Sequence, residues 1–333
     1  MKAIRLRGPA PIESAPLSSE DMSIPSPQNH EVLLRVSVCG VCRTDLHIVE
    51  GDLHLPKLPL IPGHQVVGTV VQVGSGVTRF KKGDRLGVPW LFSTCGECEF
   101  CKSERENLCD RGRFTGYHVD GGYAEHIVVH EDFAYRIPDV FSDAEAAPLL
   151  CAGVIGYRSL RLSEIKPGQR IALFGFGASA HIALQVVRYW GCEAYVFTRA
   201  KHHRTLAEAL GATWTGSTGE SPPHRVESAV VFAPAGPVVH DALRALKKGG
   251  TVSLAGIHMT PIPEMEYKLL YEERTIRSAA NSTREDVQEL LEIAAKVPVK
   301  TEVEMFPLEE ANRALLKLKM SELKGSGVLE LNR

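Results

Sequence analysis

The sequence has almost no net charge and no long apolar run. Its 38 lysine and arginine residues nearly balance 40 aspartate and glutamate residues, for a formal net charge of −2. Binding to nucleic-acid phosphates needs an excess of basic side chains on one surface, so we expect no nucleic-acid partner. No apolar stretch reaches the roughly 18 to 20 residues that span a bilayer, so we also expect no membrane partner.

The amino-terminal segment lacks a secretory pattern. Residues 1–5 (MKAIR) contain two basic residues and no apolar core of the kind found in signal peptides. We therefore expect a cytoplasmic protein. With 333 residues, of which 44% are hydrophobic, the chain is long enough for two domains with separate cores.

Cysteine is concentrated in one short segment. Four of the eight cysteines, Cys95, Cys98, Cys101 and Cys109, fall within fifteen residues. In a reducing compartment such crowding indicates a metal site rather than disulfides. Four thiolates suit tetrahedral zinc and leave it no open position, so we predict a structural zinc. The alternatives are reduced cysteines without metal and a zinc ribbon that binds DNA or protein, which the near-neutral charge disfavours.

Roughly the first 140 residues have the pattern of an antiparallel sheet. Continuous or alternating apolar residues predict strands at 31–38, 66–73 and 123–129, and glycine-containing turns separate them. We expect this part of the chain to form a partly open β-barrel.

After Pro148, short apolar runs alternate with helical stretches, which is typical of a parallel sheet with crossover helices. The expected strands are 170–174, 194–198, 228–232 and 251–255. The expected helices are 180–190, 200–210 and 238–246, with left-handed glycine caps near Gly191, Gly211 and Gly249. The polar segment 216–223 is predicted to be a surface loop. This order of elements predicts a doubly wound nucleotide-binding domain.

The last fifty residues or so lie outside this alternation. Ser282-Thr-Arg-Glu285 has the spacing of a capping box ahead of a helix at 286–296. A second helix at 308–320 and a strand at 327–331 follow. We expect these elements to fold back onto the N-terminal domain.

A second set of metal-ligand residue types lies in the β-rich part and at its end. It consists of Cys42, His64 and Cys151, the last of which lies where the two sequence patterns meet. Two thiolates and one imidazole leave zinc a fourth position for water or substrate, as a catalytic site requires. Taken singly, His64 or Cys151 is more often an ordinary core residue.

A glycine-rich turn follows the first strand of the C-terminal part. Gly175-Phe-Gly177-Ala-Ser-Ala180 lies between a predicted strand and a predicted helix, where a pyrophosphate-binding turn belongs. Ala180 replaces the third glycine, which the motif allows because that position needs only close helix-to-strand packing. An ordinary tight turn is the alternative.

The end of the next strand bears on the choice of nicotinamide cofactor. NAD-binding chains place an aspartate or glutamate there, whereas this one has Thr198 followed by Arg199. Without that carboxylate a 2′-phosphate is not repelled, and Arg199, together with Lys201, His202 or His203, offers it a cation. NADP is favoured, with NAD as the alternative cofactor. Solvated loop residues with no role are the other interpretation.

Together these features resemble the zinc-dependent alcohol dehydrogenases of the medium-chain dehydrogenase/reductase family. The matching stretches are 39–47 (CGVCRTDLH), 60–64 (LIPGH), the cysteine segment 95–109, 120–125 (DGGYAE), 146–153 (AAPLLCAG) and 175–177 (GFG). The resemblance covers nearly the whole chain, and the ordered combination is specific although each motif alone is weak. It implies a GroES-like catalytic domain at 1–150, a Rossmann cofactor-binding domain at 151–280 and a return to the catalytic domain at 281–333.

The resemblance also implies a role for each matching metal-site residue. Cys42, His64 and Cys151 match the ligands of the catalytic zinc, and Cys39 matches a non-ligand cysteine. Asp45 matches the residue that orients the histidine ligand.

Other matches concern proton transfer, cofactor and substrate. Thr44 and His47 match the family's proton relay, and Arg43 matches its contact to the cofactor pyrophosphate. Trp90 and Phe92 are candidates either to wall an apolar substrate pocket or to be core residues. Gln65 departs from the pattern, because the family usually places a glutamate directly after the histidine ligand.

The implied reaction is reversible oxidation of an alcohol or reduction of an aldehyde. Zinc lowers the pKa of the bound alcohol, hydride passes to the nicotinamide, and the proton leaves through Thr44, a cofactor ribose hydroxyl and His47. We expect two zinc ions per subunit, a small alcohol or aldehyde substrate, and a homodimer or homotetramer. The alternatives are a reductase of larger aldehydes or polyols, and a thiol-based nucleotide-binding redox sensor, which Gln65 keeps open.

Overall fold

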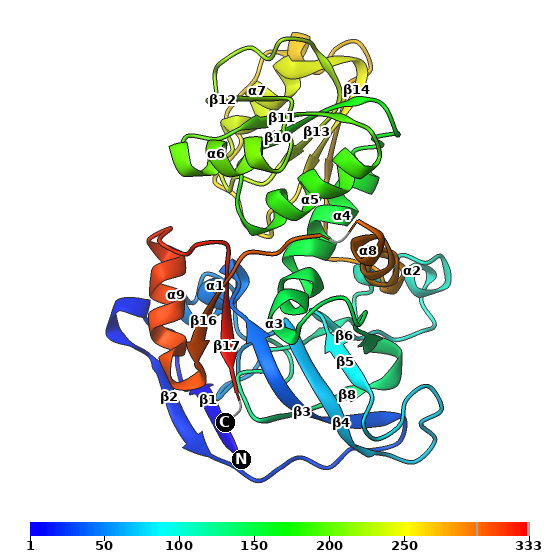
Figure 1. The fold of residues 1–333 in the computed structure, drawn as a ribbon, viewed down its shortest axis with the longest axis vertical. Helices are drawn as coiled ribbons and strands as arrows, with labels where there is room; N and C mark the ends of the chain where they lie inside the picture. The colour runs from blue at the N-terminus through cyan, green and yellow to red at the C-terminus, as the bar shows by residue number, and fades with distance from the viewer. Residues whose placement is uncertain (298, 332–333) are drawn as a thin grey trace. The chain divides into compact units, whose positions relative to one another are not determined.

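The computed structural model describes residues 1–297 and 299–331, and the chain divides into two compact units. Unit 1 comprises Met1–Cys151, Thr283–Ala295 and Lys300–Arg333. Unit 2 comprises Ala152–Ser282 and Lys296–Val299 (Figure 1).

Unit 1 contains a seven-stranded sheet in the order β16-β17-β3-β4-β5-β9, with β8 also paired to β3. The strands are β3 (Glu31–Gly40), β4 (Val66–Val73), β5 (Arg85–Val88), β8 (His126–His130), β9 (Tyr135–Arg136), β16 (Val303–Pro307) and β17 (Ser326–Glu330). Their pairings are antiparallel except for that of β16 with β17. Two ribbons complete the strands of this unit: β1 (Lys2–Leu6) with β2 (Leu17–Asp21), and β6 (Leu91–Ser93) with β7 (Arg113–Phe114).

Strand β3 is buried along most of its length. Val32, Leu34 and Val36 are fully buried, Leu33 is 4% exposed, and Arg35 is exposed. A strand directs successive side chains to opposite faces, so Val32, Leu34 and Val36 lie on one face, in the core of unit 1. The helices of this unit are α1 (Arg43–Glu50), α2 (Glu99–Lys102), α3 (Asp143–Ala146), α8 (Arg284–Lys296) and α9 (Ala311–Lys319).

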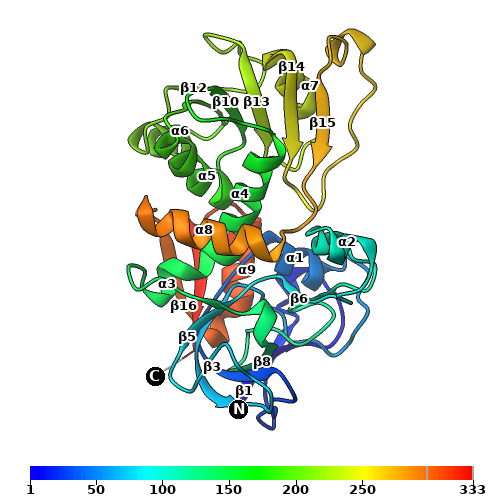
Figure 2. The ribbon, with the colours of Figure 1, turned by 90° about the vertical axis from the view of Figure 1, so that its right-hand side faces the viewer.

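Unit 2 is a six-stranded, wholly parallel sheet in the order β12-β11-β10-β13-β14-β15. Its strands are β10 (Arg170–Phe174), β11 (Glu193–Phe197), β12 (Trp214–Gly216), β13 (Val226–Val231), β14 (Leu246–Leu254) and β15 (Thr275–Ser278). Its helices are α4 (Ala152–Leu162), α5 (Ala178–Tyr189), α6 (Lys201–Ala209) and α7 (Val238–Ala245). Figures 1 and 2 show α7 on one side of the sheet and α4 and α5 on the other.

The strand order reverses between β10 and β13, because the chain runs outward from β10 to β12 and then returns. In such sheets ligands bind at the carboxyl ends of the strands beside this reversal. The predicted partly open barrel and the predicted doubly wound sheet are both confirmed. The tail strands β16 and β17 extend the sheet of unit 1 through the pairing of β17 with β3.

Three local predictions were wrong in detail. The capping box of α8 is formed by Thr283 and Asp286, whose side chains and amides bond reciprocally, one residue later than predicted from Ser282 and Glu285. Gly249 has the predicted left-handed φ of 69°, but it lies within β14, because α7 already ends at Ala245. The single helix predicted at 308–320 is a 3₁₀ turn (Leu308–Glu310) followed by α9.

Candidate active site

Helix α1 organises one group of candidate residues. Cys42 occupies its N-cap in an extended conformation, and its amide donates to Oδ2 of Asp45 at 2.9 Å. The carboxylate of a residue in the first turn thus satisfies a backbone amide that the helix leaves unpaired. This local motif fixes the position of the Cys42 thiol relative to Asp45.

The Asp45 carboxylate is fully buried and also holds His64. Its Oδ1 accepts from Nδ1 of His64 at 3.0 Å and from the Gly63 amide at 3.2 Å, and its Oδ2 accepts from the Tyr123 hydroxyl at 3.3 Å. Burial alone would lower the pKa of His64, but the charge and hydrogen bond of Asp45 outweigh it and raise that pKa to about 10. The proton on Nδ1 therefore faces Asp45, and Nε2 faces the neighbouring thiols.

The structure brings Cys42, His64 and Cys151 together. The Sγ atoms of Cys42 and Cys151 are 3.7 Å apart, and Nε2 of His64 lies 3.2 Å from Sγ of Cys151. The Cys151 thiol donates to the Cys42 sulfur and thereby holds the pKa of Cys42 well below its ordinary value. All three ligand atoms lie within 4.8 Å of one another, a spacing and donor chemistry that fit one zinc ion with an open position.

The four cysteines of the 95–109 segment form a second cluster. The sulfur of Cys95 lies 3.8 Å from that of Cys101 and 3.6 Å from that of Cys109, and Cys98 lies 3.5 Å from Cys101. Tetrahedral zinc with Zn–S bonds of about 2.3 Å separates its sulfurs by about 3.8 Å. Backbone amides of Glu97 and Cys98 lower the pKa of Cys95 to about 6. The cluster therefore fits a closed, structural zinc.

Thr44 and His47 lie three residues apart on α1, a spacing that places them on one face of the helix. Oγ1 of Thr44 is 3.8 Å from Sγ of Cys42, so the hydroxyl lies beside the cluster of Cys42, His64 and Cys151. Nδ1 of His47 is hydrogen-bonded to Oδ2 of Asp52 at 2.7 Å, a partner that no sequence pattern indicates. Arg43 donates to the carbonyl of Leu318 at 3.4 Å.

Gln65 is buried directly before β4, beside the end of β3. Its carbonyl oxygen accepts from the Gly40 amide at 2.9 Å, and a Cβ atom on Gly40 would lie 2.9 Å from the Gln65 side-chain nitrogen. Gly40 thus leaves room for the Gln65 amide.

The aromatic ring of Trp90 contacts His64 of the cluster formed by Cys42, His64 and Cys151. Its ring meets that of His64 edge-on at 4.7 Å and stacks on Phe114 at 5.2 Å and on Tyr117 at 5.8 Å. Phe92 instead lies under the guanidinium of Arg113 at 6.0 Å. No sequence pattern indicates Phe114 and Tyr117 as site residues, because the pairing of β6 with β7 brings this segment to Trp90.

In unit 2 the glycine-rich turn connects β10 to the N-terminus of α5. Gly175 has a left-handed φ of 90°, and a Cβ atom there would lie 2.9 Å from the Ala233 amide nitrogen, so only glycine fits. Gly177 is the N-cap of α5, and a Cβ atom on it would meet no other atom within 4 Å. Ala180 is fully buried. The turn thus leaves the helix N-terminus open to an anionic group.

Thr198 follows β11 and is buried, while Arg199 after it is exposed. Arg204, which no sequence pattern indicates, donates from Nε to the Thr198 carbonyl at 3.0 Å, and its guanidinium also donates to the Ser217 hydroxyl. The ring of His203 lies 6.4 Å from that of Phe176 in the glycine-rich turn. Two arginines therefore lie at the end of β11, Arg204 through its bond to Thr198 and Arg199 as the next residue.

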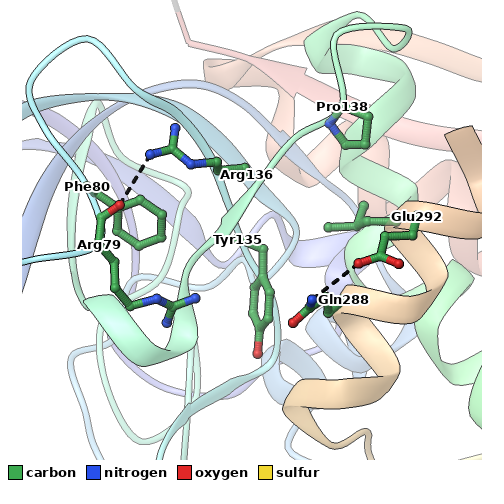
Figure 3. Close-up of a pocket in the computed structure, with 8 residues that line it drawn as sticks. Arg79, Phe80, Tyr135, Arg136, Pro138, Gln288 and Glu292 are labelled. Atoms are coloured by element: carbon green, nitrogen blue, oxygen red, sulfur yellow. Dashed lines mark hydrogen bonds between the residues drawn. The ribbon is translucent and has the colours of Figure 1, made fainter.

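A cavity of about 460 Å³ lies elsewhere in unit 1, between Phe80, Tyr135 and helix α8 (Figure 3). Arg79 and Arg136 flank it, but Arg79 already donates to the Glu131 carbonyl at 2.7 Å and Arg136 is paired with Asp84 at 2.9 Å. Its lining residues include none of the predicted site residues within the described part of the chain. Within residues 1–297 and 299–331, no helix is both long and apolar enough to span a membrane.

Known families and proteins match the chain over most of its length. The alcohol dehydrogenase GroES-like domain matches residues 28–139, and the zinc-binding dehydrogenase family matches residues 180–296.

Two relatives are similar in sequence over nearly their full length. A protein named "Probable alcohol dehydrogenase AdhA" from Mycobacterium tuberculosis is 45% identical over 335 residues, covering 99% of this chain and 97% of that protein. An alcohol dehydrogenase from Geobacillus stearothermophilus is 37% identical and covers 95% of this chain and 97% of that one.

A solved structure agrees with these matches. A cinnamyl alcohol dehydrogenase from Sorghum bicolor superposes with a TM-score of 0.90 at 27% identity, covering 99% of this chain and 97% of that one. Both domain families, the full-length relatives and the fold indicate the same family. The chain therefore belongs to the alcohol dehydrogenases of the medium-chain dehydrogenase/reductase family, which transfer hydride between an alcohol or aldehyde and a nicotinamide cofactor.

Proposed function

We propose that this chain is a zinc-dependent dehydrogenase of small alcohols and aldehydes that prefers NADP(H). The observation that carries the proposal is the cluster of Cys42, His64 and Cys151 on the buried carboxylate of Asp45. A zinc ion held there supplies a Lewis acid that polarises the oxygen of an alcohol or an aldehyde. The four-cysteine cluster holds the second zinc, which stabilises the 95–109 segment.

The chain's own residues handle the proton. The Thr44 hydroxyl, 3.8 Å from the Cys42 sulfur, is the group that hydrogen-bonds the substrate hydroxyl, and it releases its own proton toward His47 as it takes up that of the substrate. His47, one helical turn further along α1, exchanges protons with solvent. Asp45 keeps the histidine ligand in one orientation through its Nδ1 bond.

Unit 2 binds the cofactor at the N-terminus of α5. Gly175, Gly177 and Ala180 let the pyrophosphate approach the helix amides. At the end of β11, Thr198 offers no carboxylate to the adenosine ribose, and Arg199 offers a guanidinium to a 2′-phosphate. These residues favour NADP over NAD.

The substrate pocket is aromatic on one side. Trp90 contacts His64 and is held by its stack on Phe114 and Tyr117, so its ring forms a rigid apolar wall. Phe92, partly buried against the same core with its ring under the Arg113 guanidinium, is the second candidate for this wall. Such a surface favours alcohols with an apolar or aromatic chain over polyols, in line with the name of the cinnamyl alcohol dehydrogenase relative.

We also propose a homodimer or homotetramer. β15 forms an edge of the sheet in unit 2, and the nearby Tyr267 and Tyr271 are 72% and 61% exposed. An open strand edge beside exposed aromatic rings favours pairing with a second copy.

The test is turnover of a series of short, branched and aromatic alcohols and aldehydes with both cofactors, before and after removal of zinc by a chelator. We expect turnover with NADP(H) that is lost with the zinc and returns when zinc is restored. Undiminished activity of the zinc-free protein, or equal use of NAD, would overturn the corresponding part of the proposal. Light scattering of the same sample tests the oligomeric state.

A further inference from the structure

Helix α8 lies between two crossings of the chain from one unit to the other. The chain passes from unit 2 into unit 1 at Thr283, runs through α8 and returns to unit 2 at Lys296. Two cavities, of about 460 and 290 Å³, lie against this helix, and Gln288 lines both. Figure 3 shows the larger one between Tyr135 and α8. Because side chains beside a cavity lose packing contacts, polar bonds contribute more to the attachment of α8 on this side.

One such bond joins the N-terminus of α8 to the segment that contains the four cysteines. Oε1 of Glu106 accepts from the Arg284 amide at 2.8 Å and from Arg284 Nε at 3.2 Å, and only 3% of Glu106 is exposed. The first amides of a helix have no partner within it, and a carboxylate there also interacts favourably with the helix dipole. The Arg284 guanidinium lies over the Phe133 ring at 5.6 Å. Glu106 therefore caps α8 from outside the helix, in addition to the capping box of Thr283 and Asp286.

The turn that presents Glu106 leads directly to a residue of the four-cysteine cluster. Glu106 begins the 3₁₀ turn Glu106–Leu108, and its carbonyl accepts from the Cys109 amide at 3.1 Å. The Cys109 sulfur lies 3.6 Å from that of Cys95. Since Glu106 and Cys109 belong to one hydrogen-bonded turn, the position of Cys109 determines where the Glu106 carboxylate lies.

We propose that Glu106 is a zinc-dependent anchor: zinc bound by the four cysteines fixes the turn at 106–109, and Glu106 then holds the N-terminus of α8 on unit 1. The inference rests on the second zinc of the proposed function. It gives that zinc a role outside its own segment, because α8 connects both chain crossings to unit 1. Such coupling is reciprocal, so loss of the contact to α8 also weakens zinc binding by the four cysteines.

The first test is hydrogen exchange, measured by mass spectrometry on the zinc-loaded full chain. In Glu106→Ala, peptides from the first half of α8 should exchange about 10- to 100-fold faster, because a hydrogen bond from a helix amide to a charged group is lost. Glu106→Gln should cause a smaller increase, since its amide oxygen still accepts from the Arg284 amide. Glu104→Gln removes an exposed carboxylate two residues away and is the control, which should leave the exchange of α8 unchanged. Peptides from β3 and β4 report whether each variant stays folded.

The second test is zinc affinity, measured by competition with a chromogenic chelator. The binding step of the four-cysteine cluster is identified by its absence in Cys98→Ser. In Glu106→Ala the affinity of this step should fall about tenfold, whereas zinc binding by Cys42, His64 and Cys151 should not change.

Unchanged exchange of α8 in Glu106→Ala would overturn the anchor, and an unchanged affinity of the four-cysteine step would overturn its dependence on zinc. If the unaltered protein binds no zinc at the four cysteines, the second zinc of the proposed function is wrong, and the zinc dependence fails with it. The exchange experiment then still decides whether Glu106 holds α8.

Discussion

Asp45 and His64 form a buried pair in which Nδ1 of the imidazole donates to Oδ1 of the carboxylate at 3.0 Å, and neither side chain is exposed to solvent. The same carboxylate binds the amides of Cys42 and Gly63 and the hydroxyl of Tyr123. One side chain thus orients the histidine ligand and also fixes the backbone next to a cysteine ligand.

We expect Asp45→Asn to weaken zinc binding at the cluster of Cys42, His64 and Cys151 by about 10- to 100-fold. The amide cannot accept all the donors that now converge on the carboxylate, so the imidazole loses its fixed orientation. Competition with a chromogenic chelator measures the affinity, and the four-cysteine cluster serves as the internal control. Equal release of both zinc ions from the variant and the unaltered protein would refute the role of Asp45.

Cys42→Ser should abolish turnover while the protein stays folded, because the proposed open zinc loses a thiolate ligand. Cys39→Ala is the matched control: Cys39 lies three residues away and is fully buried, but is not in the ligand cluster. This control should keep both zinc ions and most of the activity. Circular dichroism checks the fold, and substantial turnover by folded, zinc-depleted Cys42→Ser would contradict the assignment.

Metal analysis of the purified protein should give two zinc ions per chain, one for each ligand cluster. Cys98→Ser should lower the content to one and reduce the Tm, because the 95–109 segment then loses its cross-link. His64→Ala should also lower the zinc content to one ion per chain. It should abolish turnover, but lower the Tm less than Cys98→Ser does. A zinc content of one or none in the unaltered protein would show that a cluster is not a zinc site.

His47→Gln should slow alcohol oxidation most near neutral pH and less in alkali, because hydroxide can then replace the base of the relay. The measurement is kcat as a function of pH for the variant and the unaltered enzyme. A constant ratio of the two rates at all pH values would assign His47 a packing role.

Arg199→Ala should reduce kcat/KM for NADP by roughly ten- to a hundredfold, equivalent to about 1 to 3 kcal/mol, and leave that for NAD nearly unchanged. Thr198→Asp should shift the preference toward NAD, since a carboxylate binds the ribose hydroxyls and repels the 2′-phosphate. Steady-state kinetics with both cofactors measures these ratios. An equal effect of Arg199→Ala on both cofactors would show that Arg199 is only a solvated loop residue.

The sequence alone determined the features that depend on short spacings. The 95–109 cysteines lie within fifteen residues, so their clustering follows from local turns. Thr44 and His47 share a face of α1 because they are three residues apart. Likewise, the alternation of apolar runs with helices predicted the parallel sheet, and Gly175 marked the turn after its first strand.

Only the tertiary structure decided which residues from distant parts of the sequence lie in contact. Cys42 and Cys151 are 109 residues apart in sequence and 3.7 Å apart in space, a distance that depends on strand pairing and core packing rather than on any local pattern. The same holds for the stack of Trp90 on Phe114, which needs the pairing of β6 with β7. The contact of Asp52 with His47 follows a left-handed turn at Gly51, where Pro9 leaves no room for a Cβ atom. Periodicity predicts which face of an element is buried, but only the register between elements decides which side chains meet across it.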